Sequence, residues 1–183
     1  MLIGPAISVA GSRRPGLDLV GPSINTILTV AQAGLGADGK GTILFRGSLD
    51  ALATGTAQSL IQIDSGSGAN RYLLSAAGGT TQSQLTRTTA SAGSTANVGA
   101  LTAATLFSIG MAIDGAGGAI ASLNGAAALS VTGGPTSGLS TFRIGAGVSG
   151  VAPIAAGSIV AVRILPGQAL VAADLQAAVA AFT

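Results

Sequence analysis

The chain has 183 residues, of which 36 are Ala, 29 Gly, 18 Ser and 17 Thr. It contains no Cys, no His and no Glu, which excludes disulfides, Cys-zinc sites, thiol nucleophiles and catalysis by a histidine base. Eight Lys and Arg residues against six Asp give a formal charge of +2, and only 8% of the residues are charged. An average soluble chain has about a quarter charged residues.

Length and charge also limit the partners that we expect. The length suits one domain with a sizeable core. No apolar run approaches the roughly 20 residues of a membrane-spanning helix, and the scattered Arg residues form no basic stripe for nucleic acid. We therefore expect neither a membrane nor a nucleic-acid partner. The low charge favours a protein held in an assembly, since free proteins rely on net charge for solubility. Codon bias in a GC-rich genome is an equal alternative.

Short apolar runs separated by Gly, Ser, Asn and Asp clusters are typical of an all-β sandwich or barrel. In the first half of the chain, Ile43 and Phe45 share one face of a run, and Ile61 and Ile63 alternate with Gln62 in another. This period of two is what a half-buried strand requires. The strands predicted in this half cover residues 24–31, 42–46, 59–64, 71–75 and 83–88.

The second half shows the same pattern more clearly. Asn124-Gly125 lies between two strand-like runs and predicts a type I′ hairpin turn, because both central residues of that turn need positive φ. In the run 141–144, Phe142 and Ile144 should point inward and Arg143 outward. The predicted strands cover residues 106–114, 118–123, 127–131, 141–144 and 158–165. Large apolar residues share one face in the first and last of these: Phe107, Ile109, Met111 and Ile113, and Val160, Val162 and Ile164.

One helix is predicted at the end of the chain, over residues 171–182, which are rich in good helix formers. Asp174 falls in its first turn, where the helix dipole favours an anion. Larger apolar side chains recur on one face at helical spacing. These are Val171, Leu175, Val179 and Phe182.

The candidate ligand-binding residues are Tyr72, Arg71 and Arg87. Exposed aromatic rings can pack on a sugar, and the chain has no Trp and a single Tyr, so Tyr72 is the candidate stacking residue. Arg71 and Arg87 are candidate contacts to an anionic glycan, with solvated strand positions as the default alternative. Tyr72 has its own alternative, which is packing inside the sandwich with Leu74, because both residues share one face of the strand.

No catalytic or metal-binding residues are predicted. Asp114 is the one acid that ends a strongly alternating run, and a paired-carboxylate glycosidase needs a second acid across the scissile bond. Asp38 and Asp114 each lie directly before a Gly, and Asp64 lies two residues before Gly66, which is ordinary turn chemistry. We therefore expect no catalytic residue, no metal ion and no cofactor.

Three segments of the second half resemble, in the same order, the concanavalin A-like, laminin-G-like jelly-roll family. Residues 106–125 resemble two paired strands ending in an Asn-Gly turn, and residues 141–147 resemble a strand ending in Ile-Gly. Residues 157–182 resemble the closing strand and terminal helix, and with the earlier strands the likeness covers roughly residues 40–182. The matching positions are Asn124, Gly125, Ile144, Gly145, Gly157, Ile159, Val162, Ile164, Ala169 and Leu170.

The resemblance implies an all-β fold, a two-sheet antiparallel jelly-roll sandwich with a short C-terminal helix. Many members of the family bind glycans or proteins, and some are glycosidases or lyases. The chain departs from the catalytic members because it has no Glu, and Leu123 replaces the aromatic that usually precedes the Asn-Gly turn. The acidic calcium ligands of the lectin branch have no clear counterpart. We assign residues 23–183 to the jelly-roll domain and residues 1–22 to an N-terminal arm or docking segment. Docking on a neighbouring subunit is one role for this arm, and a simple extra strand plus loop is the alternative.

Compact jelly rolls of this kind also occur as surface proteins of tailed phages and gene-transfer particles. By that analogy we predict a non-enzymatic virion surface protein of a head or tail. Its expected partners are other virion subunits, in a homo-oligomer, and host-surface polysaccharide. The alternative is an extracellular carbohydrate-binding module or lectin. A polysaccharide hydrolase or lyase, with Asp114 as its acid, is the least favoured.

Overall fold

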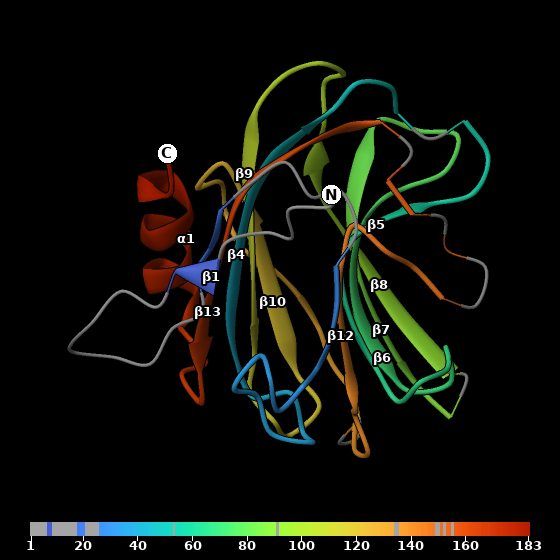
Figure 1. Ribbon diagram of the computed structural model, residues 1–183, viewed down its shortest axis with the longest axis vertical. Coiled ribbons are helices and arrows are strands. Elements are labelled where there is room, and N and C mark those ends of the chain that lie inside the picture. The colour runs from blue at the N-terminus through green and yellow to red at the C-terminus, as the bar shows by residue number, and fades with distance from the viewer. Residues whose placement is uncertain are drawn as a thin grey trace.

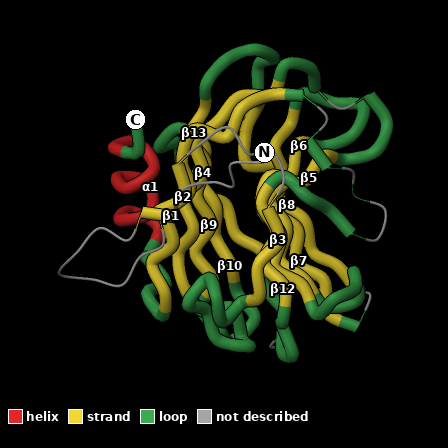
Figure 2. Tube along the Cα trace, viewed as in Figure 1, coloured by secondary structure: helices red, strands yellow, loops and turns green. Residues whose placement is uncertain are grey.

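The protein folds as two antiparallel sheets packed face to face, with one helix outside them (Figures 1 and 2). The computed structural model describes residues 7–8, 18–20, 26–52, 54–90, 92–133, 136–148, 151, 153–154 and 156–183. Within these residues the fold class agrees with the sequence prediction: all-β, two antiparallel sheets and a short C-terminal helix.

We call the two sheets sheet A and sheet B. Within the described residues, sheet A has seven strands in the order β1-β2-β13-β4-β9-β10-β11, and sheet B has six in the order β3-β12-β5-β6-β7-β8. The strands of sheet A are β1 (Ile7–Ser8), β2 (Asp18–Val20), β4 (Gly41–Leu49), β9 (Phe107–Ile113), β10 (Ala119–Leu123), β11 (Leu129–Val131) and β13 (Gly157–Pro166). Those of sheet B are β3 (Thr26–Thr29), β5 (Gln58–Asp64), β6 (Arg71–Ala76), β7 (Gln82–Thr89), β8 (Ala92–Ala100) and β12 (Thr141–Ile144).

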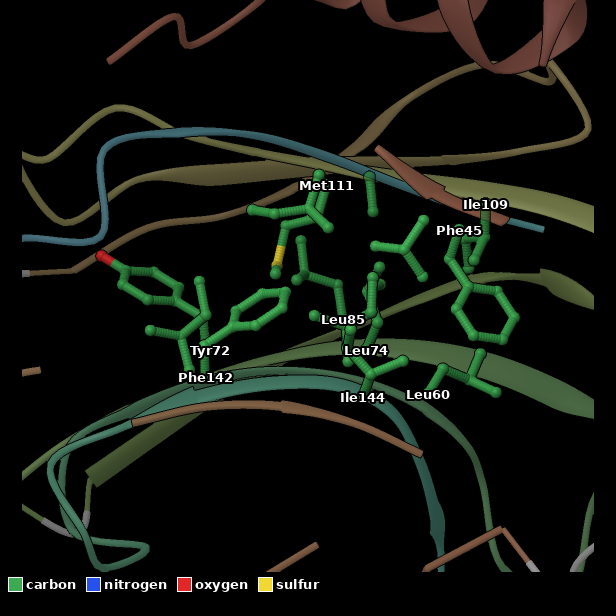
Figure 3. Close-up of a cluster of buried hydrophobic side chains, with 14 of the residues drawn as sticks. Phe45, Leu60, Tyr72, Leu74, Leu85, Ile109, Met111, Phe142 and Ile144 are labelled. Carbon is green, nitrogen blue, oxygen red and sulfur yellow. The ribbon is translucent and has the colours of Figure 1, made fainter. Parts of the chain in front are cut away.

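The hydrophobic core lies between the sheets, and the inward positions of both alternate along their strands (Figure 3). The four apolar residues predicted to share one face of β9 are all in this core, which confirms the period-two prediction. Phe142 and Ile144 are also buried there, whereas Arg143 between them points to the other face. Phe45 and Phe107 stack with their ring centroids 5.8 Å apart. The labelled members of the core in Figure 3 are Phe45, Leu60, Tyr72, Leu74, Leu85, Ile109, Met111, Phe142 and Ile144.

Helix α1 (Ala172–Ala181) packs on the outer face of sheet A, away from sheet B (Figure 1). Leu175 and Val179 are buried against Leu44 and Ala112 of that face. Val171 is 64% exposed, so it does not extend the packed face as predicted, because the helix begins only after it. The helix therefore covers sheet A and leaves the outer face of sheet B uncovered by any described helix.

Two local predictions have different outcomes. The Asn124-Gly125 turn is confirmed: φ is 50° at Asn124 and 77° at Gly125, as a type I′ turn requires. In β13, however, Val160 is 39% exposed and does not share the inward face of Val162. A register shift between Ile159 and Ala161 is the cause, since one extra residue in a strand reverses the side on which the preceding side chains point. Ile159 takes the inward position instead, at 6% exposure.

The structure describes little of the segment 1–22. Strands β1 and β2 pair with each other, and β2 pairs with β13, so these five residues extend sheet A at one edge. The other residues of the segment, and the predicted boundary between residues 22 and 23, lie outside the described residues. Docking of this arm on a neighbouring subunit stays a prediction. Among the described helical residues, none form a helix long and apolar enough to span a membrane.

Candidate functional site

Tyr72 lies in the core and not at the surface. Its exposed fraction is 0%, and its ring lies beside Phe142 in the layer between the sheets (Figure 3). Its strand partner Ile63 is equally buried, because residues that face each other across two strands share one side of the sheet. The prediction that Tyr72 stacks on a sugar is therefore wrong, and the alternative of packing with Leu74 is what the structure shows.

Arg87 is buried too, at 5% exposure. It pairs with Tyr72 across β6 and β7 and so shares the inward side of sheet B. Its Nη2 donates a hydrogen bond to Thr89 Oγ1 at 2.6 Å, and the Thr89 hydroxyl in turn lies 3.0 Å from that of Thr136. The guanidinium thus holds the segment around Thr136 against β7. It is not placed to contact a glycan, contrary to the sequence prediction.

Arg71 points the other way, onto the outer face of sheet B. Its partners across the neighbouring strands are Asp64 on β5 and Thr88 on β7. The structure therefore separates the three predicted residues, with Tyr72 and Arg87 inside and Arg71 outside. Of the three, Arg71 alone is accessible to a ligand, being half-buried.

The outer face of sheet B carries a polar ladder on β7 and β8. Gln84 Nε2 donates to Asn97 Oδ1 at 2.9 Å, and the hydroxyls of Thr86 and Thr95 lie 3.1 Å apart. Asn97 and Thr95 are exposed, and Gln84 and Thr86 are half-buried. We call these four residues the polar ladder. Their mutual hydrogen bonds hold amide and hydroxyl groups at fixed positions on an open sheet, where they can bond to a polar ligand.

The neighbouring part of the same face, on β5 and β6, is covered and not open. Leu73 is 3% exposed and Gln62 is 0% exposed, although the register places both on the outer side, in the row of Thr86. Arg71 lies next to this boundary. The outer face of sheet B therefore changes from covered to open between β6 and β8, with a cation at the transition.

Asp64 is the centre of a buried hydrogen-bond cluster at this boundary. Its carboxylate is fully buried and accepts from Arg143, with Nε–Oδ2 at 2.7 Å and Nη2–Oδ1 at 3.4 Å. Gln62 Nε2 donates to Oδ2 at 3.0 Å and the Gly66 N–H donates to Oδ1 at 2.7 Å. Four donors surround the two carboxylate oxygens, so the charge of Asp64 is fully satisfied.

Arg71 is held differently. Its Nη1 donates to the Val148 carbonyl oxygen at 3.3 Å, and within the described residues its buried Nε has no hydrogen-bond partner. Burial lowers the pKa of the Arg71 guanidinium from its ordinary value, and the charge of Asp64 opposes this change only in part. Arg71 thus carries a partly desolvated positive charge without a hydrogen-bonded carboxylate.

Asp114 follows β9 and has the turn role that the sequence predicts. Asp114 Oδ1 accepts from the backbone N–H groups of Ala116 and Gly118 at 2.7 and 2.9 Å, which is the predicted turn role. Asp114 also borders a groove of about 280 Å³ on the outer side of sheet A, lined mainly by apolar groups such as Ile120 and Leu170. Among the described residues there is no group of three or more acids that could hold a metal ion.

Comparison with known proteins shows the fold. No family model matches the chain, and no curated protein matches it. Domain 4 of AbnA, an extracellular GH43 arabinanase from Geobacillus stearothermophilus solved with arabinotriose, is similar over 90% of this chain and 72% of its own, with a TM-score of 0.64 and 17% identity. The CBM40 of the Ruminococcus gnavus IT-sialidase, bound to α2,3-sialyllactose, is similar over 76% of this chain and 82% of its own, with a TM-score of 0.58 and 15% identity.

A third likeness is to a part of a larger enzyme. The NanB sialidase of Streptococcus pneumoniae is similar over 86% of this chain but only 27% of its own, with a TM-score of 0.63 and 14% identity. The chain therefore has the jelly-roll-like β-sandwich fold that these three structures contain. At these identities the likeness concerns the fold alone.

Sequence reasoning missed the polar ladder and the role of Asp64. A signal for half of the ladder was present, since Gln82, Gln84, Thr86 and Thr88 recur at every second position and so define a polar strand face. No comparable signal marked β8, which sequence analysis did not predict as a strand. Asp64 was assigned to a turn because it precedes Ser65-Gly66, and it does accept from the Gly66 N–H. Its pairing with Arg143, which is 79 residues away, could not be predicted locally.

Proposed function

We propose that the protein is a non-enzymatic carbohydrate-binding module whose ligand lies on the outer face of sheet B. The observation that carries this proposal is the polar ladder, in which two cross-strand hydrogen bonds fix Gln84, Asn97, Thr86 and Thr95 on an open sheet. Amide and hydroxyl groups are donors and acceptors at once, as the hydroxyls of a sugar are. Because the ladder is ordered before binding, little side-chain entropy is lost when the ligand arrives.

The fold likeness supports the same proposal. Domain 4 of AbnA was solved with arabinotriose, and the Ruminococcus gnavus CBM40 with sialyllactose. The chain has no His, Cys or Glu, which agrees with a binding function and not with turnover. An extracellular setting follows from the proposal, since AbnA is an extracellular enzyme. With Tyr72 buried and no Trp in the chain, the ligand would be held by hydrogen bonds more than by aromatic stacking.

A virion surface protein is the second candidate, favoured by the charged fraction of 8%, which suits a subunit of an assembly. This role and the carbohydrate-binding role are compatible, because the predicted contact of such a protein is host-surface polysaccharide. The structures named above come from glycan-processing enzymes. We therefore favour the carbohydrate-binding module over the virion surface protein. The homo-oligomer and the docking arm 1–22 remain predictions of the second candidate.

The test is a glycan array with the wild-type protein and a double variant, Gln84→Ala with Asn97→Ala. We expect the wild type to bind a subset of glycans and the double variant to lose that binding while its unfolding midpoint stays close to the wild-type value. The matched control is Gln176→Ala on helix α1, which removes an equivalent amide on the far side of the molecule. An array with no bound glycan, or a double variant that binds as the wild type does, would reject the proposal.

A further inference from the structure

We infer that Arg71 anchors a carboxylate of the ligand, so that this module selects acidic sugars, such as uronic acids, over their neutral counterparts. This inference rests on the proposed function and names the substrate class of the same face. It follows from the charges and hydrogen bonds around Arg71, from the group that its side chain leaves open, and from its place beside the polar ladder.

The first step is the local charge. Arg71, Asp64 and Arg143 meet on the outer face of sheet B, where two cations face one anion. Arg143 takes both oxygens of Asp64, and Gln62 and Gly66 satisfy the remaining positions. Asp64 therefore has no hydrogen-bonding position left for Arg71. The cluster keeps one positive charge that is not matched by a contacting anion.

The second step is the open donor. Within the described residues, Arg71 Nε is buried and has no partner, while Nη1 is fixed by the Val148 carbonyl. A buried N–H donor without a hydrogen bond costs free energy, and an anion that accepts from it removes that cost. The planar guanidinium presents its N–H groups as a fork that fits the two oxygens of a carboxylate. Burial lowers the pKa of Arg71, and the charge of nearby Asp64 offsets this change only in part.

The third step is position. Arg71 pairs with Thr88, and Thr88 is two residues along β7 from Thr86 of the polar ladder. Two residues of a strand span about 7 Å. A short oligosaccharide lying along the strands can therefore contact Arg71 with a carboxylate and the polar ladder with its hydroxyls. Thr88 itself is buried, so the ligand would pass over it between Arg71 and the polar ladder.

The experiment compares acidic glycans with neutral partners of the same shape. The probes are oligogalacturonate, oligoglucuronate and sialyllactose, each paired with its methyl ester and each titrated calorimetrically. The proteins are the wild type, Arg71→Gln, Arg71→Lys and the control Lys40→Gln, which removes one exposed charge elsewhere. We expect at least one acidic probe to bind the wild type roughly tenfold or more above its neutral partner, as a charge-assisted hydrogen bond allows.

Arg71→Gln should remove this preference and leave the affinity for the neutral partner within about twofold, since the polar ladder is untouched. Arg71→Lys should keep only part of the preference for acidic glycans, because an ammonium has the charge but not the forked geometry of a guanidinium. Lys40→Gln should bind as the wild type does. Equal binding of acidic and neutral partners, or a preference that survives Arg71→Gln, would overturn the inference and leave the proposed function standing. A wild type that binds no probe here and nothing on the array would overturn both.

Discussion

Arg143 and Asp64 form an ion pair on the outer face of sheet B, with Arg143 Nε 2.7 Å from Asp64 Oδ2. The two residues come from β12 and β5, which are adjacent in the sheet although 79 positions separate the residues along the chain. The carboxylate is fully buried, and the arginine side chain is 13% exposed. A pair this far from solvent is costly to break, because the partner that remains keeps a buried charge.

We therefore predict that Asp64→Asn lowers the free energy of unfolding by about 3–5 kcal/mol. The substitution keeps the size of the side chain but leaves Arg143 without its paired anion and removes the charge that partly offsets the burial of Arg71. Urea unfolding followed by circular dichroism measures the change. Asp50→Asn is the control, since Asp50 is exposed and forms no side-chain hydrogen bond within the described residues, and its effect should lie within about 0.5 kcal/mol. Equal losses for the two variants would contradict the buried-pair argument.

Replacing Arg71 should change the free energy of unfolding in the opposite direction from replacing Asp64. Burial lowers the pKa of Arg71, so the folded state holds this proton less tightly than the unfolded state does. At neutral pH the residue is charged in both states, and its burial therefore costs stability. The cost begins to fall as the pH rises through the lowered pKa of the folded state, and it is gone only above the ordinary pKa of the unfolded state. We predict that Arg71→Met unfolds at an equal or higher urea concentration than the wild type at pH 7, while the preference for acidic over neutral glycans is lost.

A lower midpoint for Arg71→Met, with binding retained, would mean that Arg71 serves the fold and not the ligand. The pair of measurements separates the two roles, because a structural arginine loses stability when replaced and a ligand anchor loses affinity. The methyl-ester probes supply the second readout at the same pH.

The sequence predicted the fold where one side of a strand faces the core. In β9, four large apolar residues alternate with small ones, and all four are buried. In β8 the residues are Ala, Gly, Ser, Thr and Asn around Val98, which is the one large side chain that it buries. An edge strand with so little apolar surface carries no period-two signal, so β8 was missed. The bulge in β13 was missed because Ile159 and Val160 are adjacent and both apolar, so the sequence does not show which of them points inward.

The site was less predictable than the fold for a physical reason. Tyr72 and Arg71 are adjacent in sequence and therefore point to opposite sides of sheet B, so they could not belong to one surface site. The sequence left open which of the two faces outward. Leu74, which shares the side of Tyr72 and is fully buried, decides it. Arg87 follows Tyr72 inward through the pairing of β6 with β7, and that register was not visible in the sequence.

Tyr72 provides a direct check of this assignment. Its hydroxyl is buried and has no hydrogen-bond partner in the described part of the chain. Tyr72→Phe removes an unsatisfied polar group and keeps the ring in place, so we predict an unchanged or higher free energy of unfolding, by up to about 1 kcal/mol. Glycan binding should be unchanged. A clear loss of stability would show that the hydroxyl is bonded in solution, and a loss of binding would return Tyr72 to the ligand site.

The contact between helix α1 and sheet A gives the last prediction. Gly110 of β9 lies directly beneath the helix, and a Cβ atom placed on it would lie 2.6 Å from Val179 Cγ2, 2.8 Å from Leu44 Cδ2 and 3.0 Å from Leu175 Cδ1. These distances are too short for ordinary packing, so Gly110→Ala must shift these packed side chains between the helix and the sheet. We predict a loss of about 1–3 kcal/mol in the free energy of unfolding.

The matched control for Gly110→Ala is Gly55→Ala, because a Cβ at Gly55 meets no atom within 4 Å. That variant should unfold at or slightly above the wild-type midpoint, since alanine restricts the unfolded chain. Glycan binding should be unchanged in both variants, because the helix lies on sheet A, away from the polar ladder on the outer face of sheet B (Figure 1). If Gly110→Ala were as stable as the control, the helix would not be packed closely on β9. If it lost glycan binding while remaining folded, the ligand would lie on the helix side of the molecule.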